Sequence, residues 1–117
     1  MQKTIKIGDK EYKMKSSALT QFSYKNEMNR SFIKDLSKLT KLDLKNLDNF
    51  EILDDISELI LGISYVMIKE ADKTQVENYE SFLSEIDSMY DDINWILEVI
   101  ELGCSPISRQ LQTNQNK

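Results

Sequence analysis

The alternation of apolar and polar residues at the start of the chain predicts a β-hairpin. Apolar residues recur at every second position on both sides of Gly8-Asp9, in "IKIGDKEYKM" (residues 5–14). A Gly-Asp pair suits a tight two-residue turn, because Gly tolerates positive φ. We expect strands at about 3–7 and 10–14, with Ile5 facing Tyr12 on the packed side and Lys6 paired with Glu11 on the solvent side. Since a lone two-stranded ribbon is marginal in water, helices must cover its apolar face.

Two short helices are expected after the hairpin. Ser16 and Ser17 are good N-caps for a helix over "ALTQFSYKNEM" (residues 18–28), and Asn29 suits the left-handed conformation that ends helices. Ser31 then caps a second helix, "FIKDLSKL" (residues 32–39). The residues expected to point inward are Leu19, Phe22 and Met28 in the first helix and Phe32, Ile33, Leu36 and Leu39 in the second.

A longer central helix is predicted next. Leu42, Leu44 and Leu47 are expected to hold a connector against the core, and Asp48 with Glu51 resembles a capping box. The 3-4-3-4 spacing that follows is typical of a helix buried on one side, and its residues are Leu53, Ile56, Ile60, Ile63 and Met67. From Leu59 onward the sequence is apolar almost all round, so this should be the most buried element. Gly62 and Ser64 would let a neighbouring helix approach closely.

The last third of the chain is predicted to be helical, and the sequence "DSMYDD" favours a break near Ser88 over one long helix across residues 75–102. Thr74 with Glu77 is a second capping-box candidate, and Gly103 followed by Pro106 is expected to stop the last helix. Apolar residues recur there at a spacing of three or four, as on one side of a helix, and they are Val76, Tyr79, Leu83, Ile86, Tyr90, Ile93, Leu97 and Ile100. The chain therefore reads as mainly α (α+β), with an N-terminal β-hairpin packed on a compact bundle of about five helices. Residues 1–104 form one domain and residues 105–117 a flexible polar tail.

Neither export nor membrane insertion is indicated. We see no signal peptide, and the longest apolar run, Leu59 to Ile68, is ten residues, against the roughly 20 that a membrane-spanning helix needs. The single cysteine, Cys104, cannot form an internal disulfide, which fits a reducing cytoplasm.

Charge is distributed unevenly along the chain. Residues 1–47 contain eleven Lys or Arg and five Asp or Glu, whereas residues 48–117 contain four and fifteen. The two parts thus carry +6 and −11, which gives the net charge of −5. Two interpretations are open: pairing between the halves of one compact domain, or docking of a basic partner or of a second copy head to tail.

Few residues in this chain are of the types that catalyse reactions or bind metals and cofactors. The chain has no histidine, one cysteine and three glycines, which argues against nucleophilic catalysis, zinc sites and phosphate-binding loops. We therefore predict no enzyme and no catalytic, cofactor or metal site. The carboxylate groups of Asp54, Asp55 and Glu58 and of Asp91 and Asp92 read as solvated helix surface. Trp95 is expected in the core, with an exposed partner anchor as the alternative. The five methionines fill the core or serve an adaptable surface.

Nucleic-acid binding is not favoured. A basic patch near the hairpin would consist of Lys10, Lys13, Lys15, Lys25 and Arg30. The chain as a whole is acidic, with a pI near 4.8, and has no helix-turn-helix or base-stacking motif. We expect neither nucleic acid nor a membrane as a partner.

The layout of the chain resembles the tail assembly chaperones of long-tailed (siphovirus-type) phages or prophages of Gram-positive bacteria. The resemblance covers about residues 4–104. It rests on the hairpin leading into "SSALTQFSYKNEMNRSFIKDLSKL", then on "LDDISELILGISYVMIKEAD" and "YESFLSEIDSMYDDINWILEVIELG". It is a likeness of layout and pattern, without a diagnostic short motif.

The resemblance implies a small helical protein of the host bacterial cytoplasm, absent from the mature virion. Such chaperones coat the tape measure protein, keep it soluble and help recruit tail tube subunits, and many also exist in a longer, frameshifted form. The alternatives are a structural head-tail connector or other small virion component, and an acidic inhibitor that mimics DNA. The family has no catalytic residues to carry over, and the partner-binding residues stay unknown at this point.

Overall fold

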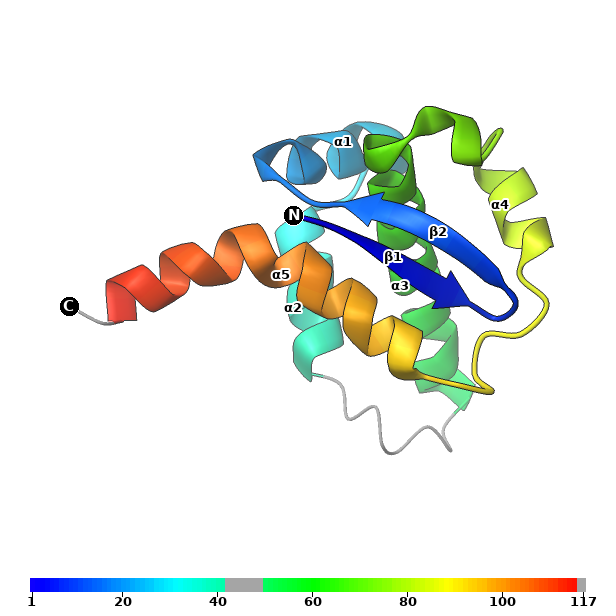
Figure 1. Cartoon of the computed structure of the whole chain (residues 1–117). Coiled ribbons are helices and arrows are strands. Elements are labelled where there is room, and N and C mark those ends of the chain that lie inside the picture. Colours follow the sequence, from blue (N-terminus) through cyan, green and yellow to red (C-terminus); the bar gives the residue numbers. More distant parts are fainter. Residues whose placement is uncertain (42–49, 116–117) are drawn as a thin grey trace.

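In the part of the chain that the structure describes, an N-terminal two-stranded sheet packs on five α-helices, as the sequence predicts (Figure 1). The computed structural model describes residues 1–41 and 50–115. The elements, in order, are β1 (Gln2–Ile7), β2 (Lys10–Lys15), α1 (Ala18–Met28), α2 (Phe32–Lys41), α3 (Phe50–Ala71), a 3-10 turn (Lys73–Gln75), α4 (Tyr79–Glu85) and α5 (Asn94–Gln115). Within the residues described, no helix is long and apolar enough to cross a membrane.

The hairpin has the predicted register and lies on the helices. Ile5 is opposite Tyr12 and Lys6 opposite Glu11, and Gly8 adopts a φ of 61° in the turn. β2 packs on α3 and β1 on α5. The inward-facing side chains of the strands are at most 4% exposed, so the hairpin is part of the core. Trp95 is buried there too, and its indole N–H donates to the backbone carbonyl of Met89 at 2.8 Å.

Helix α3 is the centre of the core, as predicted. Every residue from Leu59 to Ile68 is buried. Gly62 faces α1, but a Cβ there would make only ordinary van der Waals contact, at 3.5 Å from the Tyr24 ring and 3.7 Å from Met28. Met14 and Met67 are fully buried, and Met28 and Met89 are partly buried against the core. Four of the five methionines therefore fill the core rather than form an adaptable surface.

The predicted bounds of α1 and the predicted start of α2 are confirmed, whereas α2 continues to Lys41, two residues beyond its predicted end. Ser17 is the N-cap of α1, where its hydroxyl accepts from the N–H of Leu19 at 3.1 Å. Asn29 ends α1 in the left-handed conformation, with φ 56°. The Ser31 hydroxyl accepts from the N–H of Lys34 at 3.3 Å in the first turn of α2.

Three side chains predicted to point inward are instead exposed: Leu19 and Phe22 at 59% each and Ile33 at 51%. The buried face of α1 consists of Thr20 and Tyr24, with Met28 partly buried. Both hydroxyls find acceptors there, so they can be buried at little cost. Because these two residues occupy the inner face at i, i+4 spacing, the larger apolar residues of α1 lie outside.

The predicted capping box of Thr74 and Glu77 is wrong. Asp72 caps the 3-10 turn by accepting from the N–H of Thr74 at 2.9 Å. Asn78 caps α4 by accepting from the N–H of Ser81 at 2.8 Å. The break near Ser88 is confirmed, since α4 ends at Glu85 and α5 begins at Asn94.

The last helix does not stop at Gly103. α5 continues to Gln115 and includes Pro106. Gly103 has a packing role instead, because a Cβ there would lie 3.2 Å from Leu36 and 3.5 Å from Phe32. The flexibility of residues 105–117 stays a prediction.

The apolar spacing proposed for the last third holds only in part in α5, where Ile100 packs against the core but Leu97 does not. The buried residues of α5 are Trp95, Ile96, Val99 and Leu102, whereas Leu97 is 46% exposed. The connector leucines Leu42, Leu44 and Leu47 and the capping box of Asp48 with Glu51 lie outside what the structure describes.

Candidate docking surface

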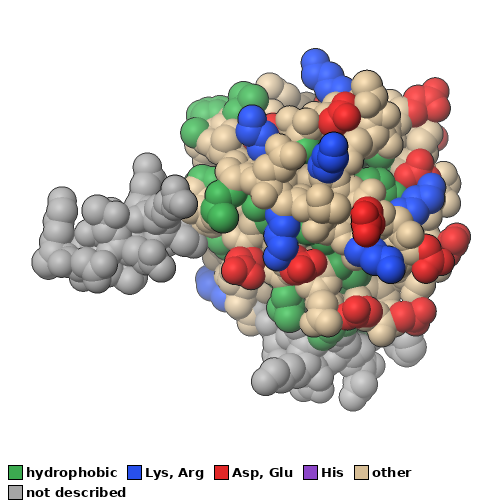
Figure 2. All heavy atoms as spheres, in the orientation of Figure 1, with side chains coloured by type: hydrophobic (Ala, Val, Ile, Leu, Met, Phe, Trp, Pro, Cys, Tyr) green, Lys and Arg blue, Asp and Glu red, His purple; other side chains and the backbone are tan. Residues whose placement is uncertain are grey.

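The exposed apolar residues of α1 and α2 gather on one face of the molecule. Leu19 and Phe22 are three residues apart on α1 and so share its outer side, and Ile33 stands in the first turn of α2. Figure 2 shows hydrophobic side chains at the surface near the edge where α1 lies in Figure 1. We refer to the surface formed by Leu19, Phe22, Lys25 and Ile33 as the α1–α2 face.

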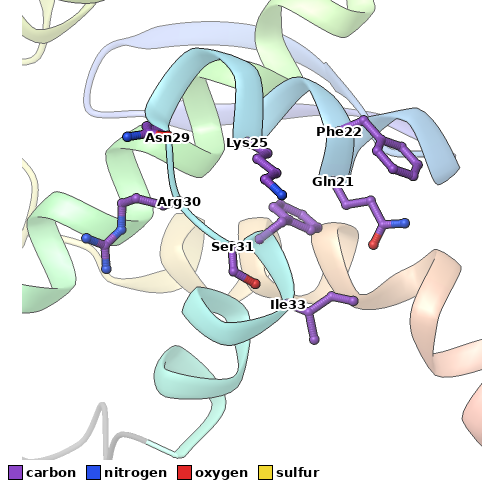
Figure 3. A pocket seen from close by; sticks show the side chains of 8 residues that line it. Gln21, Phe22, Lys25, Asn29, Arg30, Ser31 and Ile33 are labelled. Carbon is purple, nitrogen blue, oxygen red and sulfur yellow. The ribbon is translucent and has the colours of Figure 1, made fainter.

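A hollow of about 340 Å³ lies between the two helices on this face (Figure 3). Phe22 and Lys25 line it from α1, and Phe32 and Ile33 line it from α2. Phe32 is buried, whereas Phe22 and Ile33 stand out into solvent. An aromatic floor with apolar side chains at its edges can accept the side chains of a partner that lies across it.

A second hollow, of about 360 Å³, lies on the other side of α1, toward α3. Leu19 and Ser23 line it from α1 and Val66 from α3, and its edge carries charges of both signs. Helix α1 therefore forms a ridge with a hollow on each flank.

The exposed charge of α1 and α2 is mainly positive. Lys25, Lys34, Lys38 and Lys41 are exposed and make no ion pair with another described residue. The two acidic residues of these helices are neutralised within the fold, because Glu27 pairs with Lys69 and Asp35 with Arg30. The α1–α2 face is thus apolar and basic, although the whole chain is acidic.

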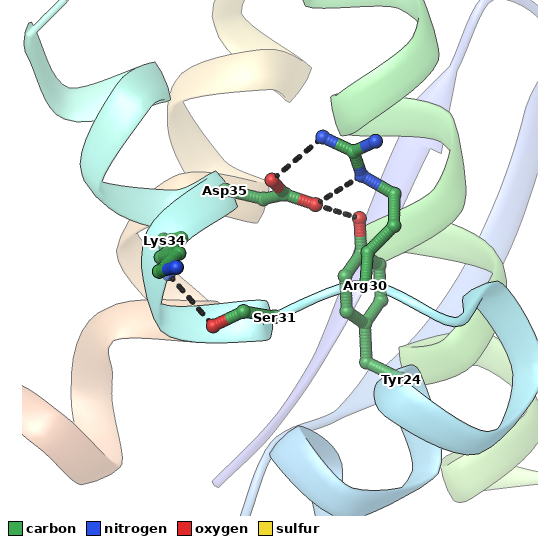
Figure 4. Close-up of polar contacts among 5 residues, drawn as sticks. All are labelled: Tyr24, Arg30, Ser31, Lys34 and Asp35. Carbon is green, nitrogen blue, oxygen red and sulfur yellow. Dashed lines mark hydrogen bonds and ion pairs between the residues drawn. The ribbon is translucent and has the colours of Figure 1, made fainter.

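A buried hydrogen-bond network fixes the angle between α1 and α2 (Figure 4). Asp35 is 2% exposed and accepts from the Tyr24 hydroxyl at 2.6 Å. The Arg30 guanidinium donates to both oxygens of the same carboxylate, at 2.8 and 3.0 Å. Two parallel hydrogen bonds of this kind fix the orientation of both side chains. It joins the end of α1, the corner after it and the first turns of α2 into one rigid unit.

The same network shifts the pKa values of its members. Burial acts to raise the pKa of Asp35, but the hydrogen bonds from Arg30 and Tyr24 and the positive charge of Arg30 outweigh it and hold that pKa below its usual value. Burial, followed by the hydrogen bond to Asp35, raises the pKa of Tyr24. Asp35 is therefore an anion and Tyr24 a neutral donor at neutral pH.

The start of α1 is tied to the end of α3 by a second polar cluster. The Glu70 carboxylate accepts from the Ser17 hydroxyl at 2.8 Å and from the Thr20 hydroxyl at 2.7 Å. The Lys69 ammonium pairs with Glu27, the second-last residue of α1. Helix α1 is thus anchored at both ends, so its outer face is held out rigidly.

The other candidate groups from the sequence do not assemble into a site. In the part of the chain that the structure describes, no three metal-ligating side chains come together. Asp54, Asp55, Asp91 and Asp92 are exposed, and burial raises the pKa of the half-buried Cys104 thiol. The basic patch proposed near the hairpin is divided, since Lys10 pairs with Glu85 at 3.7 Å and Arg30 with Asp35.

Sequence reasoning missed the α1–α2 face because it assigned its three apolar residues to the core. One signal was present: Thr20, Tyr24 and Met28 are spaced i, i+4, i+8, which offers an alternative inner face for α1. No family model, no curated protein and no solved structure matches this chain.

Proposed function

We propose that this chain is a tail assembly chaperone of a long-tailed phage or prophage of Gram-positive bacteria. In this proposal it binds the tape measure protein in the host cytoplasm, keeps it soluble and helps to recruit tail tube subunits. It performs no enzymatic reaction and leaves before the tail is complete.

The observation that carries the proposal is the α1–α2 face. A chaperone for a long helical client needs a closed core of its own and a separate surface that receives apolar segments. Here the core is well packed, yet three large apolar side chains stand exposed together on a rigidly held pair of helices. Contiguous exposed apolar surface of this kind marks interaction sites in folded proteins.

The alternative, a structural head-tail connector, also needs an interface. The two functions differ in whether the protein remains in the finished phage particle. Quantitative mass spectrometry of purified particles measures the copy number of this chain against a tail tube subunit. A chaperone is absent from finished particles, although it co-purifies with the tape measure protein from infected or induced cells. A fixed stoichiometric copy number in finished particles would instead identify a connector.

The remaining alternative, a DNA mimic, predicts a different partner. Such a protein would compete with DNA for a DNA-binding protein through an acidic surface. The α1–α2 face has the opposite charge, and its apolar character is not needed for mimicry. Recovery of a DNA-binding protein rather than the tape measure protein would contradict the chaperone proposal.

A further inference from the structure

The shape of the α1–α2 face fits a helix. The exposed apolar side chains come from two adjoining helices, and a hollow lies on each side of the α1 ridge. Surfaces of this type receive amphipathic helices, whose side chains at i, i+3, i+4 and i+7 enter the hollows. An extended strand would need an open sheet edge for backbone pairing, and α1 and α2 offer none because their backbone groups are bonded within the helices.

The charge of the face selects among amphipathic helices. Lys25 lines the hollow between α1 and α2, beside Phe22 and Ile33. The carboxylates of both helices are already paired with Arg30 or Lys69. A partner with Asp or Glu beside its apolar stripe therefore gains favourable contacts, whereas one with Lys or Arg there meets uncompensated positive charge.

We propose that the α1–α2 face binds amphipathic helical segments of the client whose apolar stripe is flanked by acidic residues. This inference rests on the proposed function for the identity of the client, the tape measure protein. Phe22 and Ile33 are the apolar anchors, and Lys25 selects the charge of the client helix. The segments bound are accordingly a subset of the client, chosen by the charge beside their apolar residues.

The experiment measures binding of the full-length chain to a set of overlapping synthetic peptides that cover the tape measure protein. Fluorescence anisotropy gives a dissociation constant for each peptide at low and high salt. We expect the tight-binding peptides to be those with acidic residues next to the apolar stripe. Phe22→Ser with Ile33→Ser should weaken them about tenfold or more, as loss of interface anchors does. Lys25→Glu should weaken them at low salt, with a smaller effect at high salt.

Matched control variants separate the α1–α2 face from general effects. Leu97→Ser removes an exposed apolar side chain from α5, and Lys6→Glu with Lys13→Glu reverses two exposed lysines on the hairpin. Both should leave the dissociation constants within about twofold, as expected of residues outside the interface. Circular dichroism of every variant checks that the helices remain folded.

The outcomes distinguish failure of this inference from failure of the proposed function. If peptides bind but the Phe22/Ile33 variant binds them equally well, the docking surface is elsewhere and the chaperone proposal stands. If the Phe22/Ile33 variant loses peptide binding, but wild-type protein binds peptides with basic residues beside the apolar stripe as tightly as those with acidic residues there, the charge selection is wrong. If no tape measure peptide binds the wild-type chain, the proposed client is wrong and this inference falls with it.

Discussion

Replacing Asp35 by Ala should destabilise the protein by removing the acceptor that holds α1 and α2 together. The Tyr24 hydroxyl, on a residue only 1% exposed, would lose its partner. A buried donor left without an acceptor costs about 1–3 kcal/mol. The Arg30 side chain is 39% exposed, so loss of its ion pair adds only about 0–1 kcal/mol. The expected loss in the free energy of unfolding is therefore about 1–4 kcal/mol.

A double-mutant cycle tests whether the network acts as a unit. Tyr24→Phe removes one hydrogen bond to a charged acceptor, which costs about 1.5–3 kcal/mol. Once the hydroxyl is gone, removing Asp35 no longer leaves a buried donor unpaired. The double variant should therefore be less destabilised than the sum of the single variants, by about 1–3 kcal/mol.

Urea unfolding followed by far-ultraviolet circular dichroism at pH 7 gives the four free energies, provided the slope with urea is the same in all of them. Tyr12→Phe is the control, because the Tyr12 hydroxyl donates to Glu85 at 2.7 Å and shares no partner with Asp35. Its effect should add to that of Asp35→Ala within about 0.5 kcal/mol. Equal additivity for Tyr24→Phe would refute the view that Tyr24 and Asp35 form one network.

Three further predictions follow from the same structure. Because the pKa of Asp35 is held below its usual value, its carboxylate contributes stability above the unfolded-state pKa of about 3.9, and this stability is lost as pH falls through the lowered folded-state pKa. Urea unfolding at a series of acid pH values should show this loss of stability in the wild type and not in Asp35→Asn. An equal loss in both proteins would contradict the prediction. Gly103→Val places methyl groups against Leu36 and Phe32 and should cost about 1–3 kcal/mol in urea unfolding, so unchanged stability would mean that α2 and α5 are not closely packed there. The uneven charge of the two halves predicts self-association at about 20 mM salt that fades at about 500 mM, as measured by sedimentation velocity. A monomer at both salt concentrations would instead mean that the charges pair within one molecule, as Lys3 does with Glu98 and Lys10 with Glu85.

The elements of this fold were predictable wherever one periodic pattern dominated. The hairpin register followed from alternation around Gly8, and the buried stretch of α3 followed from a run that is apolar almost all round. The ends of α1 followed from Ser17 and Asn29, whose side chains and conformations suit helix termini. In each case the local signal and the tertiary packing agree.

The candidate site was not predictable, because it depends on tertiary polar contacts. Burial of Thr20 and Tyr24 is favourable only because Glu70 and Asp35 supply acceptors from other helices. No pattern within α1 shows those acceptors, so the larger apolar Leu19 and Phe22 were assigned to the core. Gly103 was misread for a similar reason, since its role is a close approach to α2 rather than a helix end.

The soluble fraction of the tape measure protein tests the central claim most directly. It is measured by centrifugation of lysates after expression alone, with this chain, or with an unrelated acidic protein of similar size. The proposed function predicts that the tape measure protein is soluble and co-purifies only when this chain is present. Equal solubility with the unrelated protein, or a precipitated tape measure protein beside a folded, soluble copy of this chain, would contradict it.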